Sequence, residues 1–534
     1  FLFTNIMIFV IINILIHTFK SMNYGYVLYA FEIYYNINIK GMIIITPDKR
    51  LLKCADMVIG NGKVCDVGTD HAYLSAYLVQ QKICNSVIAS DIADGPLEAA
   101  QTTIDRLGLS DKITLIKSDG LKNIGSDGVT DVIIAGMGAE TISAIINDAK
   151  WLRNNINIII QPMTKIPFMR KWLYENKFEI IKEEAVSDEG FIYTIMNIRY
   201  SGYHIQINET FANAGKFDYS DKDAKKFGEV QINRLRSISK GISQSDPKSE
   251  KVLMLRDVCL KISDMISGNM TVTVEDVYNQ INEAADFSTQ DSWDNSGLLV
   301  GNMKDKVTGI LVTLDITDEV IKEALAEKAN LIVSHHPVIF HPLKNLSLKN
   351  PAVKMAAAGI AAICVHTPID MAVNGINDLI IDLLRDQFKL DECIQPIIPL
   401  KKGSSAGTGR ICEISGDSMT ATQMAAKLKK IFGCKVIRYT NTTMSVKKIA
   451  ICSGSGGSLL GDVIENECQA YITGDIKHDI WIEAANNNIA LFDCGHFYTE
   501  TIVAEYITKL LQANIMGIKI ISAKSNIDVV SYEI

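Results

Sequence analysis

The sequence predicts an α/β fold in two successive parts, with a helical coiled-coil arm between them. Short apolar runs alternate with helical patterns from Met42 to about Tyr200, and the same alternation resumes after Met270. Between these parts, apolar residues recur at near-heptad spacing, which is typical of paired helices. The chain has 534 residues, more than three times the roughly 150 residues of a typical domain. We therefore expect several domains.

The composition is that of an ordinary globular protein. Hydrophobic residues make up 48% of the chain and charged residues 21%, which argues against extensive disorder. The net charge of −8 excludes a chain coated uniformly for nucleic acid, although a local basic patch is compatible with it. The 11 cysteines form no Cys-x-x-Cys pair, so a zinc ribbon and a thioredoxin motif are both excluded. We interpret them as reduced, buried thiols of a cytoplasmic protein.

Residues 1–41 differ from the rest of the chain. The run Phe1–Phe19 is apolar enough for a signal anchor, but polar residues interrupt it and no small-residue cleavage site follows. The segment is rich in Ile, Asn, Tyr and Phe, as an upstream region read in frame would be. We interpret it as an artefactual or dispensable extension, with Met42 as the biological start and no membrane association. A membrane anchor is the alternative.

Five apolar runs in the first part are predicted to be strands of a mostly parallel sheet, because their spacing fits βαβ units. These runs are Lys63–Val67, Ser86–Ser90, Ile113–Lys117, Val132–Ala135 and Ile156–Ile160. Two later runs, Phe178–Ile181 and Phe191–Ile198, flank the turn-like segment 187–190 and predict a closing hairpin.

Glycine or aspartate follows each of the first four predicted strands. In a doubly wound sheet the ligand lies at the carboxyl ends of the strands, and an acid after the second strand can bind ribose hydroxyls. Glycine at such a turn lets the backbone approach a ligand closely. The residues concerned are Asp66, Gly68, Asp70 and His71 after the first strand, Asp91 after the second, Asp119 and Gly120 after the third, and Gly136, Met137 and Gly138 after the fourth.

This pattern predicts a nucleoside cofactor. Each aspartate alone would more simply cap a helix, but four strand ends in register are harder to explain in that way. No G-x-G-x-x-G run is present, which disfavours NAD(P) and favours S-adenosylmethionine. No Asn-Pro-Pro-Tyr-type tetrapeptide follows the fourth strand, so methylation of an exocyclic amine is disfavoured.

The predicted arm carries a local excess of positive charge. Residues 216–261 contain 11 Lys or Arg against 7 Asp or Glu, a local charge of +4 in an acidic protein. Two apolar series on either side of Ser245-Asp246-Pro247 predict two antiparallel helices. They are Phe227, Val230, Leu235, Ile238 and Ile242, followed by Val252, Leu255, Val258, Ile262 and Ile266. The charge fits either a nucleic-acid-binding surface or a simply solvated helical face.

An ordered set of motifs in the first part resembles the bacterial tRNA (adenine(22)-N1)-methyltransferases. The motifs are KRLLKCADMV (49–58), DVGTDHAYL (66–74), DGPLEAA (94–100), SDGL (118–121), IAGMG (134–138), QP (161–162), WLYENKF (172–178) and the segment around Tyr193. The resemblance runs from Met42 to about Ile266. It implies a Rossmann-like class I methyltransferase domain over 42–200 and a coiled-coil arm over 201–268.

The resemblance also implies S-adenosylmethionine as cofactor and tRNA as partner. The strand-end residues would then bind the cofactor, and Asp70 is the candidate for orienting the adenine. Because N1 of adenine is itself the nucleophile, positioning can suffice without a strong base. The chain departs from the family pattern at Ala139, Met163 and Phe191, where the family usually has Gly, Asn and Lys. Binding of tRNA or cofactor without catalysis therefore stays open as an alternative.

Histidines and carboxylates gather in the last part of the chain. His335 and His336 follow the apolar run Leu331–Ser334, and Asp370 follows another, Ala361–Val365, by way of His366-Thr367-Pro368. Near the C-terminus, His496 and Glu500 are spaced i, i+4 and share one helical face. Adjacent residues of a strand face opposite ways, so His335 and His336 can serve one site only where the strand ends, at Pro337.

These residue types predict a transition-metal site. Imidazoles together with carboxylates suit Fe, Zn, Mn, Ni or Co rather than Ca or Mg. Five ligands exceed the usual number for one catalytic zinc, but they fit two metal ions bridged by a carboxylate. A single buried histidine would be an ordinary core residue, but His335, His336, Asp370, His496 and Glu500 together predict a dinuclear centre.

Residues 270–534 resemble the type 2 GTP cyclohydrolase I homologues, also called dinuclear-metal-centre hexameric proteins. The matching motifs are DSWDNSGLLVG (291–301), LDITDEVIKEA (314–324), LIVSHHPVIFHPLK (331–344), HTPIDMAVNGIND (366–378), GTGR (407–410), SGSGGSL (453–459), YITGDIKHD (471–479) and DCGHFYTE (493–500). The resemblance implies that all five predicted ligands carry over and that the chain assembles as a homohexamer. The small-molecule substrate stays open, because GTP hydrolysis is not securely the shared activity of this family.

The sequence thus predicts a natural fusion, and two hypotheses follow. In the first, the chain is bifunctional, with a tRNA methyltransferase joined to a dinuclear metal hydrolase. In the second, the metal half is a non-catalytic scaffold or metallochaperone attached to the methyltransferase.

Overall fold

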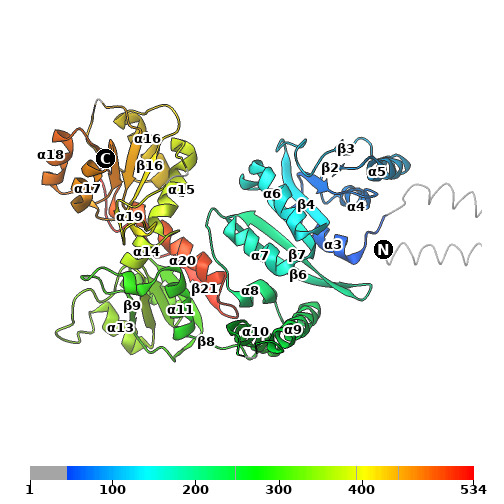
Figure 1. Cartoon of the computed structure of the whole chain (residues 1–534), viewed down its shortest axis with the longest axis horizontal. Coiled ribbons are helices and arrows are strands. Elements are labelled where there is room, and N and C mark those ends of the chain that lie inside the picture. Colours follow the sequence, from blue (N-terminus) through cyan, green and yellow to red (C-terminus); the bar gives the residue numbers. More distant parts are fainter. Residues whose placement is uncertain (1–44, 247, 392–393, 443, 534) are drawn as a thin grey trace, which may run out of the picture. The chain divides into compact units, whose positions relative to one another are not determined.

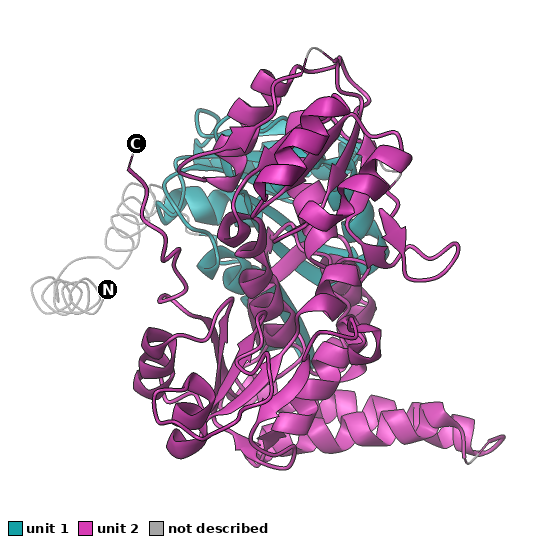
Figure 2. Ribbon diagram, turned by 90° about the vertical axis from the view of Figure 1, so that its left-hand side faces the viewer, with its two compact units in different colours: residues 1–162, 186–197 teal, residues 163–185, 198–534 magenta. Residues whose placement is uncertain are grey.

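A computed structural model describes residues 45–246, 248–391, 394–442 and 444–533 (Figure 1). The expected extension 1–41 and the expected start at Met42 lie outside these residues. The chain divides into two compact units (Figure 2). The first comprises the described residues up to Pro162 together with Val186–Asn197, and the second comprises Met163–Ala185 and the chain from Ile198 onward. No helix within the described ranges is long and apolar enough to span a membrane.

The first part contains a seven-stranded sheet in the order β3-β2-β1-β4-β5-β7-β6. Strand β1 pairs in parallel with β2 and β4, and β2 pairs in parallel with β3, so the order reverses beside β1. This doubly wound order confirms the predicted Rossmann-like fold. The strands are β1 (Lys63–Val67), β2 (Ser86–Asp91), β3 (Ile113–Lys117), β4 (Val129–Gly138), β5 (Asn157–Thr164), β6 (Phe178–Asp188) and β7 (Phe191–Tyr200).

Capping residues fix the ends of the helices in the first part. Asp48 caps the first of them by accepting a hydrogen bond from the Leu51 N–H at 2.8 Å. Gly108 ends α5 in the left-handed conformation, with φ +64°. The helices are α3 (Lys49–Asp56), α4 (Tyr73–Gln80), α5 (Asp94–Leu107), α6 (Ala139–Asp148) with the 3₁₀ turn Lys150–Arg153, and α7 (Ile166–Glu175).

The hairpin predicted at the end of the sheet is present. Strands β6 and β7 are joined by Glu189 and Gly190, which both have positive φ, at 46° and 86°. A two-residue turn with both central residues in this region matches the twist of a β-hairpin. Strand β6 is longer than the predicted run 178–181, because polar residues continue it to Asp188.

The arm consists of α8 (Glu209–Ala214), α9 (Lys222–Ser243) and α10 (Glu250–Ser267), and α9 and α10 pack against each other. Phe227, Ile232 and Leu235 are buried on α9, whereas Val230 and Ile238 are exposed. The near-heptad prediction placed both exposed residues in the helix contact. It was wrong for Val230 because the five-residue step from Val230 to Leu235 is not a helical repeat, so the two side chains lie on different faces. The structure gives no such reason for Ile238, which follows Leu235 by three residues.

The last part contains two five-stranded sheets, in the orders β21-β11-β12-β13-β9 and β16-β18-β19-β20-β17. The strands of the first are β9 (Gly297–Val300), β11 (Gly309–Thr313), β12 (Leu331–Ser334), β13 (Ala361–Cys364) and β21 (Lys519–Ser522). Those of the second are β16 (Arg410–Glu413), β17 (Arg438–Tyr439), β18 (Lys448–Ile451), β19 (Ala470–Thr473) and β20 (Ala490–Asp493). Short two-residue strands complete this part: β8 (Val272–Thr273), β10 (Lys306–Val307), β14 (Ile398–Pro399) and β15 (Gly407–Thr408).

Helices connect these strands and cover their faces (Figure 1). They are α11 (Val274–Ala284), α12 (Asp318–Ala326), α13 (Pro351–Ala358), α14 (Thr367–Met371), α15 (Ile376–Phe388), α16 (Ala421–Phe432), α17 (Leu460–Glu465), α18 (His478–Asn486), α19 (His496–Glu500) and α20 (Ile502–Gln512), with 3₁₀ turns at Phe287–Thr289 and Gly457–Leu459. The central strands β12, β13, β19 and β20 are buried throughout, as parallel strands covered on both faces should be. The ten described cysteines are all free and buried, as the sequence predicted for them.

Candidate metal centre and candidate cofactor site

The five predicted metal ligands converge at strand ends. His335 and His336 directly follow β12, Asp370 lies on α14 shortly after β13, and His496 and Glu500 lie on α19 shortly after β20. Strands β12 and β13 belong to one sheet and β20 belongs to the other, so both sheets contribute.

Glu500 lies at the middle of this group. Its Oε2 atom is 2.9 Å from the Nε2 atoms of both His336 and His496, and its Oε1 atom is 3.8 Å from the Nε2 atom of His335. Asp370 Oδ1 is 3.7 Å from the same His335 nitrogen. The Nε2 atoms of His336 and His496 are 3.3 Å apart. One carboxylate therefore contacts three imidazoles, which is the arrangement expected of a bridging ligand.

Hydrogen bonds on the far side of each imidazole fix its orientation. When Nδ1 donates its proton to an oxygen, the lone pair of Nε2 is left to face the centre. The pairs are His335 with the Val365 carbonyl oxygen at 2.9 Å, His336 with Asp315 Oδ1 at 2.8 Å, and His496 with Asp475 Oδ2 at 2.8 Å. This outer layer of acceptors is typical of metal-binding histidines.

The donor set fits a bound cation. Two buried atoms of this group, His335 Nε2 and Asp370 Oδ1, make no hydrogen bond within the described residues. Buried polar atoms normally find partners, so these two atoms beside the Glu500 carboxylate fit a positively charged ligand. Nitrogen and carboxylate donors in this mixture suit a transition metal.

The electrostatics of the site also favour positive charge. Burial lowers the pKa of His336, but hydrogen bonds to Asp315 and Glu500 outweigh it and raise that pKa to about 10. The pKa of His496 rises in the same way to about 9, because Glu500 and Asp475 outweigh burial. Burial raises the pKa of Glu500, yet the three neighbouring imidazoles dominate and lower it well below the ordinary value. Burial raises the pKa of Asp370.

Gly454 brings a glycine-rich loop against the centre. Its φ is +63°, and a Cβ atom there would lie 2.1 Å from Glu500 Oε1 and 3.3 Å from His496 Nε2. Any side chain would therefore displace the carboxylate. The backbone N–H of Gly454 is held by Thr499 Oγ1 at 3.1 Å. The run SGSGGSL signalled this loop in the sequence, but no role was assigned to it there.

In the first part, the predicted cofactor residues gather at the carboxyl ends of β1, β2 and β4 and beyond β3. A Cβ atom on Gly68 would lie 2.2 Å from Met137 Cε, so the ends of β1 and β4 meet only because Gly68 has no side chain. Gly120, Gly136 and Gly68 all have positive φ, at 58°, 79° and 82°. A close backbone approach at this edge thus requires glycine at several of the predicted positions. Gly138 is the cap residue of α6.

The aspartates at this edge differ in their surroundings. Asp66 is buried and accepts a hydrogen bond from Ser75 Oγ at 2.7 Å, and burial raises its pKa. Asp91 is half-buried and accepts the Ala93 N–H at 2.8 Å. Asp119 is exposed and pairs with Lys122 at 2.5 Å. Asp66 therefore ties the end of β1 to Ser75 of α4 and supports the loop between them. Asp91 and Asp119 are more accessible, and their carboxylates can contact a ligand.

Asp70, the candidate for orienting adenine, is exposed. Its Oδ2 atom is 3.6 Å from His71 Nε2, and the His71 ring stacks on Tyr73 at 5.2 Å between centroids. Both residues follow β1 on the loop that leads into α4.

Gln161, the first residue of the QP motif, had no role assigned from the sequence. The side chain of Gln161, in β5, is completely buried. Its Oε1 atom accepts hydrogen bonds from Arg50 Nη1 at 2.8 Å and from the Gly136 N–H at 3.0 Å. The Arg50 guanidinium lies 6.0 Å from the centre of the Tyr193 ring. Gln161 thus joins the ends of β4 and β5 to a cation and an aromatic ring.

Comparison with known proteins identifies both parts. Residues 272–528 match the family described as Duf34/NIF3 (NGG1p interacting factor 3). The GTP cyclohydrolase 1 type 2 homolog of Lactococcus lactis is 35% identical over 237 residues, which cover 42% of this chain and 86% of that protein. The NIF3 homolog of Schizosaccharomyces pombe is 30% identical over 249 residues, covering 44% of this chain and 84% of that protein. The chain belongs to the Duf34/NIF3 family.

The first part is a methyltransferase domain, matched over residues 47–196. The tRNA (adenine(22)-N(1))-methyltransferase of Bacillus subtilis is 28% identical over 221 residues, covering 39% of this chain and 91% of that protein. This Duf34/NIF3 protein therefore combines the two kinds of domain that the sequence predicted.

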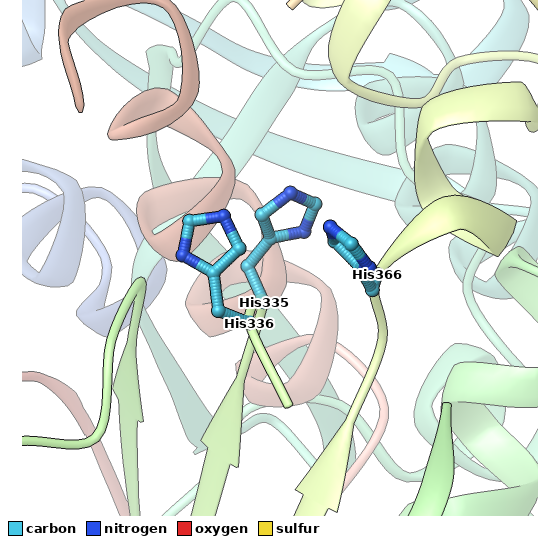
Figure 3. A group of neighbouring side chains, drawn as sticks. All are labelled: His335, His336 and His366. Atoms are coloured by element: carbon cyan, nitrogen blue, oxygen red, sulfur yellow. The ribbon is translucent and has the colours of Figure 1, made fainter. Parts of the chain in front are cut away.

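His366 is a residue of the Duf34/NIF3 domain that the sequence analysis left out of the ligand set. Its ring lies 5.1 Å from that of His335 and 5.4 Å from that of His336 between centroids (Figure 3). One nitrogen from each of the three lies within 4.8 Å of the others. Its Nδ1 atom donates to Asp294 Oδ1 at 2.7 Å, so it is oriented as the ligand histidines are. The His-x-x-x-Asp spacing to Asp370 was the available signal.

Proposed function

We propose that the chain is a bifunctional fusion protein of the cytoplasm. Residues 42–200 are the methyltransferase domain, 201–268 the arm, and 270–534 the metal domain. The first half transfers a methyl group from S-adenosylmethionine to N1 of adenine 22 in tRNA. Support comes from the similarity to the Bacillus subtilis enzyme together with the strand-end geometry. The cytoplasmic assignment is supported by the free, buried cysteines.

In this proposal, Asp91 binds the ribose hydroxyls of the cofactor and Asp119 with Gly120 lies near its base. Gly68, His71, Gly136, Met137 and Gly138 form the backbone cradle around it, and Asp66 supports the loop. Asp70 orients the adenine. Because the adenine nitrogen is the nucleophile, the domain contributes mainly by holding the two reactants in line.

The test is methyl transfer from labelled S-adenosylmethionine to a tRNA transcript with adenine at position 22. A matched transcript with guanine at that position is the control. We expect label in the first transcript only. Label in both would place the target elsewhere, and cofactor binding without transfer would favour a binding protein.

For the second half, we propose a dinuclear metal centre with a hydrolase-like activity on a small molecule. His335, His336, Asp370, His496 and Glu500 would hold two divalent transition-metal ions, from among Fe, Zn, Mn, Ni and Co. Two such ions polarise a substrate and lower the pKa of a water molecule. The observation that carries this proposal is the convergence of three histidines on the Glu500 carboxylate. Beside it, the buried atoms His335 Nε2 and Asp370 Oδ1 have no hydrogen-bond partner within the described residues. Asp315, Asp475 and the Val365 carbonyl group orient the imidazoles.

We further propose that the metal domain assembles as a homohexamer. The alternative is a non-catalytic scaffold or metallochaperone. Elemental analysis of the purified chain tests the metal content, and turnover of GTP or small phosphoesters by the metal-loaded chain tests catalysis. Turnover that is lost in Glu500→Ala supports the hydrolase. Release of metal to an apo-protein without turnover supports the metallochaperone.

A further inference from the structure

We propose that Trp293 and Phe340 form an aromatic ledge that binds the planar heteroaromatic ring of the substrate of the metal centre. The inference rests on the proposed function of the Duf34/NIF3 domain and names the class of its substrate. A flat ring such as a nucleobase would stack on the ledge, while its polar substituents would reach the metal ligands past His366.

The ledge is continuous with the metal centre. The His366 ring lies 5.1 Å from His335 and also 5.7 Å from Trp293, which it meets edge to face at 80°. The Trp293 ring in turn lies 6.0 Å from that of Phe340. Four rings therefore run without interruption from a buried metal ligand to the surface. A ligand that lies along this path contacts the centre at one end and the ledge at the other.

Both ledge residues are unusually exposed for their size. Trp293 is 56% exposed and Phe340 is 43% exposed. Large aromatic rings are normally buried because they carry the largest apolar surface of any side chains. An exposed pair beside a set of convergent polar groups is typical of a ligand-binding surface.

The ledge is held rigidly on both sides. Asp294, next to Trp293, has a completely buried side chain that accepts hydrogen bonds from His366 Nδ1 at 2.7 Å and Thr367 Oγ1 at 2.6 Å. Asn295 Nδ2 donates to the carbonyl oxygen of Ile339, next to Phe340, at 2.5 Å. The two segments that carry the rings are thus tied to each other and to the metal centre. A preorganised surface loses little entropy when a ligand binds.

The chemistry of this surface selects a flat, polar-edged ring. The rings of the ledge offer π faces for stacking, and the neighbouring centre is lined by carboxylates and imidazoles that require a polar group or a metal. A purely aliphatic ligand could not interact favourably with these carboxylates and imidazoles. Leu346 and Leu348, further along the same loop, are exposed apolar residues outside the ledge. Leu346 therefore supplies a control substitution.

The experiment compares two probes that share a phosphate and a ribose. Guanosine 5′-monophosphate carries a purine, and ribose 5-phosphate carries none. The full chain is loaded with zinc and saturated with S-adenosylhomocysteine, so that the methyltransferase half does not bind the purine. Affinities are measured by calorimetry and by quenching of indole fluorescence. Base stacking on an aromatic side chain predicts at least about a fivefold tighter binding of the nucleotide.

In Trp293→Ala, we expect this advantage to vanish, while ribose 5-phosphate binds as it does to the wild type. Trp293→Phe keeps a ring and should retain most of the advantage, and Leu346→Ala should retain all of it. Equal affinities of the two probes for the wild type, or an undiminished advantage in Trp293→Ala, would overturn the ledge. A change in sedimentation of Trp293→Ala would also overturn it, by showing that the surface is a contact between copies. The metal centre is judged separately, by elemental analysis and by whether ribose 5-phosphate binding requires zinc.

Discussion

His336 and His496 are 160 positions apart in the sequence, yet their Nε2 atoms lie 3.3 Å from each other. His336 follows β12 of one five-stranded sheet and His496 follows β20 of the other. Each histidine has its Nδ1 atom bound to a carboxylate, and each Nε2 atom lies 2.9 Å from Glu500 Oε2. A cation at this point would therefore join the two sheets as well as neutralise the carboxylates.

Removal of Glu500 should empty part of the centre. We expect Glu500→Ala to lose at least one of two bound ions, because water cannot replace the charge of a bridging carboxylate. Elemental analysis of the purified full chain measures this. His341→Ala and His478→Ala are the controls, since both residues are exposed and neither belongs to a metal-competent group within the described residues. Full metal content in Glu500→Ala, or an equal loss in a control, would show that the ligand set is wrong.

Metal binding should release protons and tighten as the pH rises. Ordinary histidines protonate near pH 6.5, but without metal the pKa of His336 is about 10 and that of His496 about 9. At neutral pH an incoming ion must therefore displace protons from both rings. We expect metal affinity to increase up to about pH 10.

The stability of the metal-free protein changes with pH in the opposite direction to its metal affinity. A raised histidine pKa stabilises the folded protein at pH values below the ordinary histidine pKa, and this stability is lost as the pH rises through 9 to 10.

Calorimetric titration with zinc in two buffers of different ionisation enthalpy counts the protons that metal binding releases. No proton release at pH 7 would contradict these pKa shifts.

Much of the fold was predictable because its strands are short apolar runs that end at polar residues. Lys63–Val67 and Leu331–Ser334 have the predicted bounds, and the i, i+4 spacing of His496 and Glu500 identified α19. Strand β6 was predicted too short, at Phe178–Ile181. It continues through Glu183, whose side chain is buried only because Arg170 pairs with it. A local apolar pattern cannot show that partner.

The convergence of the five candidate ligands was predictable from residue type and position at strand ends, but His366 was not included among them. Its orientation depends on Asp294, 72 positions away, and no local spacing reveals that hydrogen bond. The same holds for Gln161, whose Oε1 atom accepts hydrogen bonds from residues on other elements. Sequence patterns thus located the residues at strand ends, whereas the contacts that orient them needed the three-dimensional structure.

Asp91 should contribute directly to cofactor affinity. Loss of its carboxylate in Asp91→Ala leaves the ribose hydroxyls without an acceptor, and we expect weaker S-adenosylmethionine binding by roughly 1–3 kcal/mol. Calorimetry on the full chain measures the affinity. Asp105→Ala is a matched control near the far end of α5, where the carboxylate binds only Gln101 and Ser110 among the described residues. Unchanged affinity in Asp91→Ala would remove this residue from the site.

The basic residues of α9 should contribute to tRNA binding through the phosphate backbone. Reversing the charges of Lys225, Lys226, Arg234 and Arg236 should weaken tRNA binding and flatten its salt dependence, because fewer counterions are released. Arg234 also holds the helix in place, since its guanidinium donates to Asn213 Oδ1 at 2.9 Å.

A second variant that leaves Arg234 intact separates these two effects. Reversal at Lys225 and Arg236 alone should lower the slope of log affinity against log salt while leaving thermal stability unchanged. Filter binding over a series of salt concentrations measures the slope. An unaltered slope would show that these charges lie on a solvated helical face and do not contact tRNA.

Arg170 and Glu183 should form the main anchor of the arm. Both side chains are completely buried, and Arg170 Nη2 donates to Glu183 Oε1 at 2.7 Å. Arg170 Nη1 also donates to the Ala212 carbonyl oxygen at 2.7 Å, and Glu183 Oε2 accepts the Lys216 N–H at 2.7 Å. These bonds reach both sides of the segment that joins α8 to α9. Removing one partner leaves the other charge buried and unpaired, which costs about 3–5 kcal/mol of the free energy of unfolding.

We therefore expect Arg170→Met to unfold at lower denaturant concentration by that margin, and the double variant Arg170→Met, Glu183→Leu to recover part of the loss, since no charge then stays buried. Lys171→Ala is the control, because its ion pair with Glu209 is partly exposed and such pairs contribute at most about 1 kcal/mol. Where Arg170→Met still folds, the arm should lose its fixed position, so tRNA should bind more weakly while S-adenosylmethionine affinity is unchanged. Equal losses for the two ligands would mean that the ion pair stabilises the whole methyltransferase domain and has no special role in holding the arm.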